Sequence, residues 1–77
     1  MTAELWRQTD STLALHVDAE HKREIRNIKR SRNWELILKH EKNGKIYAYQ
    51  WRVHNSDYQS AHRIVKRINE GDRESAE

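Results

Sequence analysis

The dipeptide Asn43-Gly44 constrains the fold of this chain more than any other feature. It lies between residues 34–40 and 46–53, which both alternate between apolar and polar side chains. An Asn-Gly pair adopts the positive φ angles of a type I′ turn, which joins two antiparallel strands through a two-residue loop. The sequence therefore predicts a β-hairpin over these two segments.

A two-residue loop also predicts the register of the hairpin, because it places Lys42 opposite Lys45. One face then pairs His40 with Tyr47, Leu38 with Tyr49, Leu36 with Trp51 and Trp34 with Val53. The other face pairs Glu41 with Ile46, Lys39 with Ala48, Ile37 with Gln50 and Glu35 with Arg52. We expect the first face to enter the core, since periodic apolar residues are more typical of a core than of a base-stacking surface. A slip of one residue would exchange the two faces.

A helix is predicted after the hairpin, over residues 57–70. Ser56 is a suitable N-cap, Gln59 completes a capping box, and Gly71 is a natural residue to end the helix. Its expected core face consists of Tyr58, Ala61, Ile64, Val65 and Ile68.

A second helix is predicted before the hairpin, over about 19–31, with Asp18 as its cap. Its apolar stripe is thin and consists mainly of Ile25 and Ile28. Residues 12–17 alternate and indicate a strand, whereas residues 4–8 fit either a further strand or a helical turn.

These elements give an α+β fold in the order (β)βαββα. We expect a small antiparallel sheet with a central β-hairpin and two helices, packed mainly on one face of the sheet. Residues 1–71 form a single domain in this interpretation, and residues 72–77 form a polar, frayed tail.

Composition narrows the class of protein. The 77 residues include no Cys, so no disulfide framework or thiolate metal site is expected, and no apolar run is long enough to span a bilayer. The first residues lack the pattern of a signal peptide, so we expect a soluble, cytoplasmic protein with no membrane partner.

The sequence carries no catalytic motif. It has no Gly-rich phosphate loop, no nucleophile elbow and no nucleophile with a matching base, so we expect a protein that is not an enzyme and needs no cofactor. The five His residues lack the spacing of a metal site, so no metal is expected.

Basic residues give the first functional hypothesis, a small nucleic-acid-binding or nucleic-acid-associated regulatory module. Basic helix faces would contact phosphates in such a module. The alternative explanation is a pair of solvated helix faces. The candidate residues are Lys22, Arg23, Arg26, Lys29, Arg30 and Arg32 in or next to the helix predicted over about 19–31, and Arg63, Lys66 and Arg67 in the helix predicted over 57–70.

The second face of the hairpin gives the rival hypothesis, a protein-interaction module. Ile37, Ile46 and Ala48 lie among polar residues there, and an apolar cluster with a polar rim often marks an interface. Such a protein would be a homodimer, or a small inhibitor or adaptor that docks on a larger protein. Alternatively, Ile25 and Ile28 of the first helix cover this face.

The segment from Trp34 to Ile68 resembles the three-stranded-sheet-and-helix domains that bind integrase arm sites. Lys42-Asn43-Gly44-Lys45 and Ser60-Ala61 carry the resemblance, which covers less than half of the chain. The helix inserted between the strands departs from that pattern. The resemblance implies that a sheet face with Lys39, Gln50 and Arg52 reads DNA.

Overall fold

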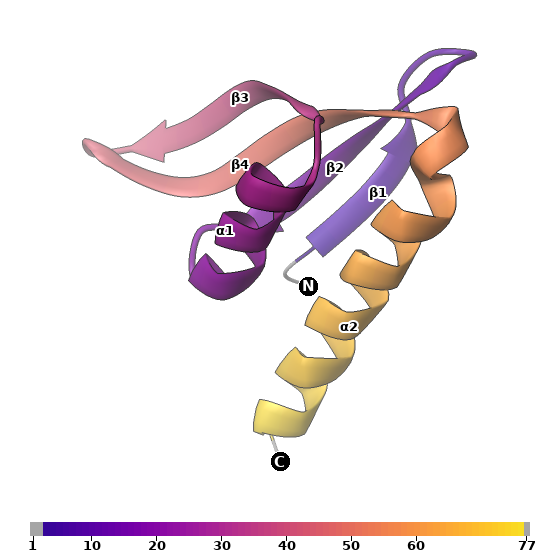
Figure 1. The fold of residues 1–77 in the computed structure, drawn as a ribbon. Helices are drawn as coiled ribbons and strands as arrows, with labels where there is room; N and C mark the ends of the chain where they lie inside the picture. The colour runs from indigo at the N-terminus through magenta and orange to yellow at the C-terminus, as the bar shows by residue number, and fades with distance from the viewer. Residues whose placement is uncertain (1–2, 77) are drawn as a thin grey trace.

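Four antiparallel strands form one sheet, and two helices lie on one of its faces (Figure 1). This computed structural model describes residues 3–76, without the side chains of residues 31 and 71–76. The strand order in the sheet is β1-β2-β4-β3. The predicted α+β class and the order ββαββα are confirmed. The sequence left residues 4–8 open between a strand and a helical turn, and the structure has a strand there, over Ala3–Arg7. The elements are β1 (Ala3–Arg7), β2 (Thr12–Asp18), α1 (Lys22–Ser31), β3 (Glu35–Lys42), β4 (Lys45–His54), a 3-10 turn η1 (Asn55–Asp57) and α2 (Tyr58–Ala76).

The core lies between the sheet and the two helices. Alternation along β2 and β4 places Leu15 opposite Trp51, with both side chains buried on the helix-covered face. Ile28 of α1 and Ile64 of α2 pack into the same cluster. Both helices therefore cover one face, and the opposite face of the sheet carries no helix.

The hairpin turn has the predicted geometry. Asn43 has a φ of 55° and Gly44 a φ of 80°, as a type I′ turn requires. The turn-proximal pairs Lys42–Lys45 and Glu41–Ile46 are present, and so are Leu36–Trp51 and Glu35–Arg52 at the far end.

The middle of the hairpin differs from the predicted register. Leu38 lies opposite Gln50, Lys39 opposite Tyr49 and His40 opposite Ala48, one residue out of the expected alignment. Two irregularities produce this offset, with Ile37 as the extra residue on β3 and Tyr47 as the extra residue on β4. Because the two bulges lie on opposite strands, the second restores the register that the first disturbs.

The bulges change which side chains share a face. Leu38 and His40 lie opposite Gln50 and Ala48, so they belong to the helix-free face. The pairing of β2 with β4 places Asp18 opposite Ala48. This pairing extends β2 to Asp18, which therefore cannot cap α1 as predicted; the N-cap residue of α1 is His21.

The start of α2 also differs from the prediction. His54 accepts a hydrogen bond from the N–H of Ser56, so Ser56 lies within a 3-10 turn and does not cap the helix. Asn55 ties this turn to the β1–β2 loop by donating from its side chain to the carbonyl of Asp10, at 2.7 Å. Tyr58, predicted for the core, is exposed at the first position of α2, where its ring stacks on His62.

The end of α2 lies beyond the predicted position. The helix runs to Ala76, so Gly71 does not end it. The predicted polar tail over residues 72–77 lies outside the part of the chain whose side chains are described.

Candidate nucleic-acid interface

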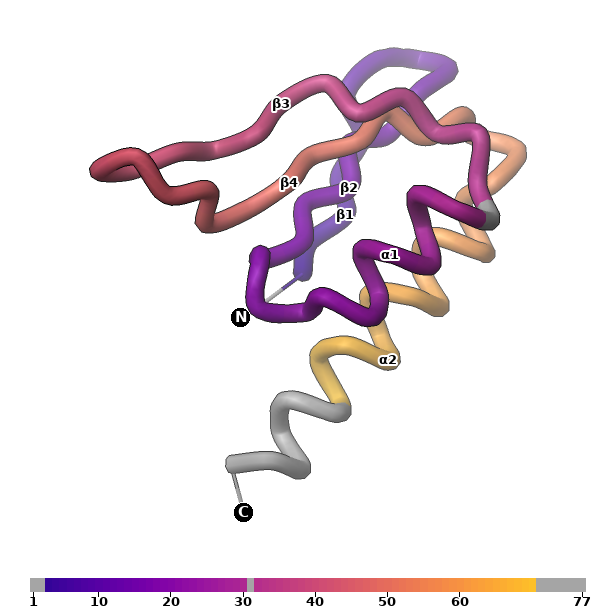
Figure 2. The backbone as a smooth tube through the Cα atoms, turned by 60° about the vertical axis from the view of Figure 1, so that its left-hand side comes forward, coloured from indigo at the N-terminus to yellow at the C-terminus, as the bar shows by residue number. Residues whose placement is uncertain are grey.

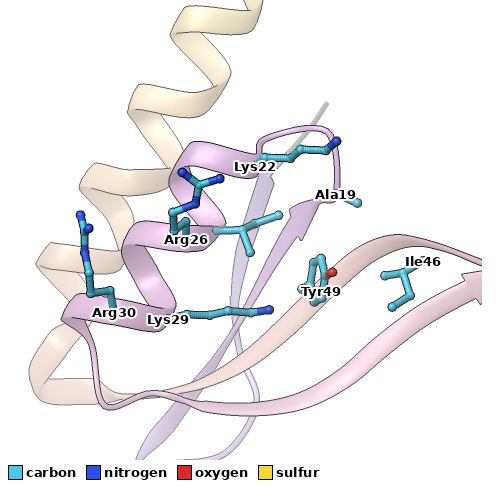
Figure 3. Close-up of a pocket in the computed structure, with 8 residues that line it drawn as sticks. Ala19, Lys22, Arg26, Lys29, Arg30, Ile46 and Tyr49 are labelled. Carbon is cyan, nitrogen blue, oxygen red and sulfur yellow. The ribbon is translucent and has the colours of Figure 1, made fainter.

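A groove of about 630 Å³ lies between α1 and the β3–β4 hairpin (Figure 3). Figures 1 and 2 show why it forms: the hairpin extends away from the rest of the sheet, and α1 lies between the hairpin and α2. Eight side chains line the groove, namely Ala19, Lys22, Ile25, Arg26, Lys29, Arg30, Ile46 and Tyr49.

One wall of the groove is a stripe of cations on α1. Lys22, Arg26 and Arg30 follow one another at intervals of four residues, which places them on one side of a helix about 6 Å apart along its axis. Figure 3 shows Lys22 extending toward Ala19, whereas the guanidinium groups of Arg26 and Arg30 point upward from α1 and not toward Tyr49. Ile25 and Ile28 point into the core and thereby fix the rotation of the helix.

The floor of the groove is apolar and aromatic. Tyr49 contributes its ring, which stacks on Trp51 with 6.0 Å between the ring centroids. The ammonium group of Lys29 lies 4.8 Å from the centroid of the Tyr49 ring, in cation–π contact. Figure 3 shows Lys29 reaching Tyr49 from α1, with Ile46 on the other side of the ring.

The bulge at Tyr47 creates this floor. Because Tyr47 is the extra residue on β4, Ile46 lies on the same side of the hairpin as Tyr49, facing α1. Without the bulge, Ile46 would lie on the helix-free face, as the simple alternation predicted. Tyr49 was expected to be a core residue, and its strand position gave no indication that it also borders a groove.

The groove is strongly electropositive. None of its eight lining residues is acidic among the described side chains. Residues 22–32 contain six cations and one carboxylate, a net charge of +5; the whole chain carries +3, so the remainder carries −2. The single carboxylate, Glu24, lies on the other side of α1 and pairs with Arg67 of α2 at 2.8 Å.

The structure brings together four of the nine predicted basic residues: Lys22, Arg26, Lys29 and Arg30. Arg32 instead lies over the Trp34 ring, 5.5 Å from its centroid. Arg23 is exposed outside the groove, and on α2 the same holds for Arg63 and Lys66. Arg67 pairs with Glu24 between the two helices and, with Arg30 and Arg32, lines a second, smaller pocket outside the groove.

The three residues of the predicted protein interface are not on one surface. Ile46 lines the groove, Ala48 is fully buried on the opposite face of β4, and Ile37 is half-buried at its bulge. The reason is again the pair of bulges, which reassigns side chains between faces. Nor do Ile25 and Ile28 cover the second face, since both belong to the core under the helices.

The DNA-reading face implied by the resemblance is not assembled either. Gln50 is only 7% exposed and accepts a hydrogen bond from Nε2 of His40 at 3.3 Å. Lys39 lies opposite Tyr49, so it faces the helix side of the hairpin. Arg52 forms an ion pair with Glu35 at 3.2 Å.

The helix-free face instead carries a row of rings, of which the sequence pattern predicted only the His40–Tyr47 contact. Trp6, His16, His40 and Tyr47 follow one another across the sheet, with centroid separations of 6.5, 5.3 and 5.8 Å. They come from four different strands, so only the sheet order and the bulges bring them together.

Among the side chains that the structure describes, no three His, Cys, Asp or Glu residues are placed to hold a metal ion together. No described helix combines the length and the apolar character needed to cross a membrane.

Comparison with known proteins gives no match: no family model fits the chain, and neither a curated protein nor a solved structure resembles it.

Proposed function

We propose that this chain is a small nucleic-acid-binding module that contacts phosphates through α1. The observation that carries the proposal is the groove beside α1, where four cations meet with no acidic side chain among the described residues that line it. A solvated helix face would carry both signs of charge, with acidic residues positioned to pair with the basic ones.

The distribution of charge supports the same proposal. The net charge of the whole chain is mild, but the cations of α1 are concentrated on one wall, and the only carboxylate of that helix is turned away toward Arg67. Each phosphate that meets a Lys or Arg releases condensed counterions, which makes such binding favourable at low salt.

Titration of the full chain with labelled nucleic acid tests the proposal. Duplex and single-stranded DNA and RNA are titrated by fluorescence anisotropy at low and moderate salt. We expect binding at low salt that weakens as salt rises, and further weakening in the variant Arg26→Gln, Arg30→Gln. Absence of binding to every nucleic acid at low salt would refute the proposal.

A matched control separates the groove from net charge alone. The variant Arg63→Gln, Lys66→Gln removes the same two charges from exposed positions of α2, outside the groove. We expect it to bind nearly as well as the unmodified chain. Equal losses in the two double variants would show that binding reflects overall charge and that α1 has no special role.

A second candidate function is self-association through the helix-free face. Trp6, Leu38 and Tyr47 are 40%, 50% and 52% exposed on or beside it, more apolar surface than a solvent-facing sheet usually carries. A second copy would cover this face by an isologous contact. Light scattering tests it: a dimer mass that Leu38→Lys returns to the monomer supports the contact, and a monomer at high concentration excludes it.

A further inference from the structure

We infer that the groove binds an unpaired nucleotide, with its base against the Tyr49 ring and its phosphates on the cations of α1. This inference rests on the proposed function and names the form of nucleic acid that the same site takes. Two surfaces of different chemistry meet in one groove, and each matches one part of a nucleotide.

The wall matches the phosphates. Lys22, Arg26 and Arg30 lie at intervals of four residues along α1, which places them in a stripe on this helix (Figure 3). Guanidinium groups bind phosphate oxygens through two parallel hydrogen bonds, and an ammonium group binds them as a point charge. A strand that follows the helix axis would meet these cations in succession.

The floor matches a base. It consists of the planar Tyr49 ring together with the apolar side chains of Ile46, Ile25 and Ala19. An aromatic ring in a cationic groove is the usual arrangement by which proteins hold unpaired bases, because every base has a π-face that stacks on it.

A duplex would not use this floor. Its bases are stacked on one another and paired, so only its phosphates would reach the α1 stripe, and the Tyr49 ring would stay in contact with Lys29. The apolar floor therefore favours a single strand, or a strand with an unpaired nucleotide, over a continuous duplex.

The Tyr49 ring is held in position on both the sheet side and the helix side. On the sheet side it stacks on the buried Trp51, with 6.0 Å between the two ring centroids. On the helix side the ammonium group of Lys29 lies 4.8 Å from the centroid of the Tyr49 ring. A ring that is already ordered loses little conformational freedom when a base stacks on it. Displacement of the Lys29 ammonium group by a base would release that cation to pair with a phosphate.

The test compares three probes of equal length with the full chain: a single strand, its duplex, and a single strand in which abasic sites replace the bases. Each set is made in DNA and in RNA, and the set that binds more tightly is used. The abasic strand keeps the phosphates and removes the stacking groups. We expect the normal strand to bind about 5- to 150-fold more tightly than the abasic strand, the range for stacking of one base.

Variants then assign the preference to Tyr49. Tyr49→Leu should remove most of the difference between the normal and abasic strands, and Tyr49→Phe should retain it. Tyr58→Leu is the matched control, because Tyr58 is an exposed tyrosine that lies outside the groove. The comparison of probes with the unmodified chain does not depend on whether Tyr49→Leu folds.

The outcomes separate the two claims. Equal binding of normal strand, abasic strand and duplex would overturn this inference and leave phosphate binding by α1 intact. A normal-strand preference that Tyr49→Leu leaves unchanged in a folded protein would also overturn it. Failure of all three probes to bind at low salt would overturn the proposed function, and this inference with it.

Discussion

The side-chain amide of Asn69 hydrogen-bonds both backbone groups of Ala3. The N–H of Ala3 donates to Oδ1 at 3.2 Å, and Nδ2 donates to the carbonyl of Ala3 at 3.1 Å. The amide thus occupies the position of a neighbouring strand at the outer edge of β1. In this way α2 covers part of a sheet edge that would otherwise expose unpaired backbone groups.

We expect Asn69→Ala to lower the free energy of unfolding by about 1–2 kcal/mol, since each of two partly buried hydrogen bonds contributes about 1 kcal/mol. Denaturation in urea, followed by tryptophan fluorescence, measures the change. Glu70→Ala is the control, because Glu70 is the exposed neighbour on the same helix. Equal stabilities of the two variants would show that the Asn69 amide does not hold the edge of β1.

Trp51 is the largest fully buried side chain, at 1% exposure. Trp51→Ala should cost about 3–5 kcal/mol, the usual penalty for truncating a large buried aromatic residue. A loss of this size is enough to unfold a marginally stable small domain. Circular dichroism at 20 °C, a temperature near maximal stability for many domains (about 10–20 °C), should show loss of the folded spectrum.

Trp6→Ala provides the comparison for that prediction. Trp6 is 40% exposed on the helix-free face, so the same truncation should cost only about 1–2 kcal/mol and leave the chain folded. If the two variants were equally stable, the core would not be centred on Trp51.

Gly44 should be intolerant of a side chain for a backbone reason alone. Its φ is +80°, although a Cβ at this position would contact nothing within 4 Å. Gly44→Ala should therefore cost about 1–2 kcal/mol through strain in the left-handed region. Thermal unfolding followed by circular dichroism measures the loss. Asn43→Gly, at the other positive-φ position, should be nearly neutral in the same measurement; an equal loss there would show that φ is not the cause.

Salt dependence gives a count of the phosphates that α1 contacts. The slope of log K against log salt is about −0.9 per phosphate for duplex DNA and about −0.7 for a single strand. The variant Arg26→Gln, Arg30→Gln loses two phosphate contacts, so the slope for a single strand should become less negative by about 1.4. The anisotropy titration repeated over a series of salt concentrations measures it, and an unchanged slope would mean that neither arginine contacts a phosphate.

Much of the fold follows from local patterns in the sequence. Asn43-Gly44 specifies a turn type by itself, because few residues other than these adopt two successive positive φ angles. The strand alternation around Trp51 and the periodicity of Ala61, Ile64 and Ile68 likewise identify the buried faces, since burial repeats with the geometry of the element. These predictions depend only on residues that are close in the chain.

The candidate site was predicted only in part. The cations of α1 were identified because they recur at helical spacing, and four of them do line one groove. Ile46 was not assigned to that groove, because the strand that carries it was expected to be regular, and Tyr49 was expected only as a core residue.

The sequence pattern did not predict the bulges at Ile37 and Tyr47, and only the tertiary structure shows them. A regular ladder satisfies the same turn and the same end pairs, Lys42–Lys45 and Glu35–Arg52, so the alternation alone cannot reveal two compensating insertions. Their consequences appear only when other strands and α1 are in place: Ile46 faces α1, and His40 joins His16 on the helix-free face. The sequence by itself determined the turn, the element types after residue 8 and the cationic stripe, which are local properties of the chain. The tertiary structure decided which side chains share a surface, because the face that a strand residue occupies depends on pairing with residues far away in the sequence.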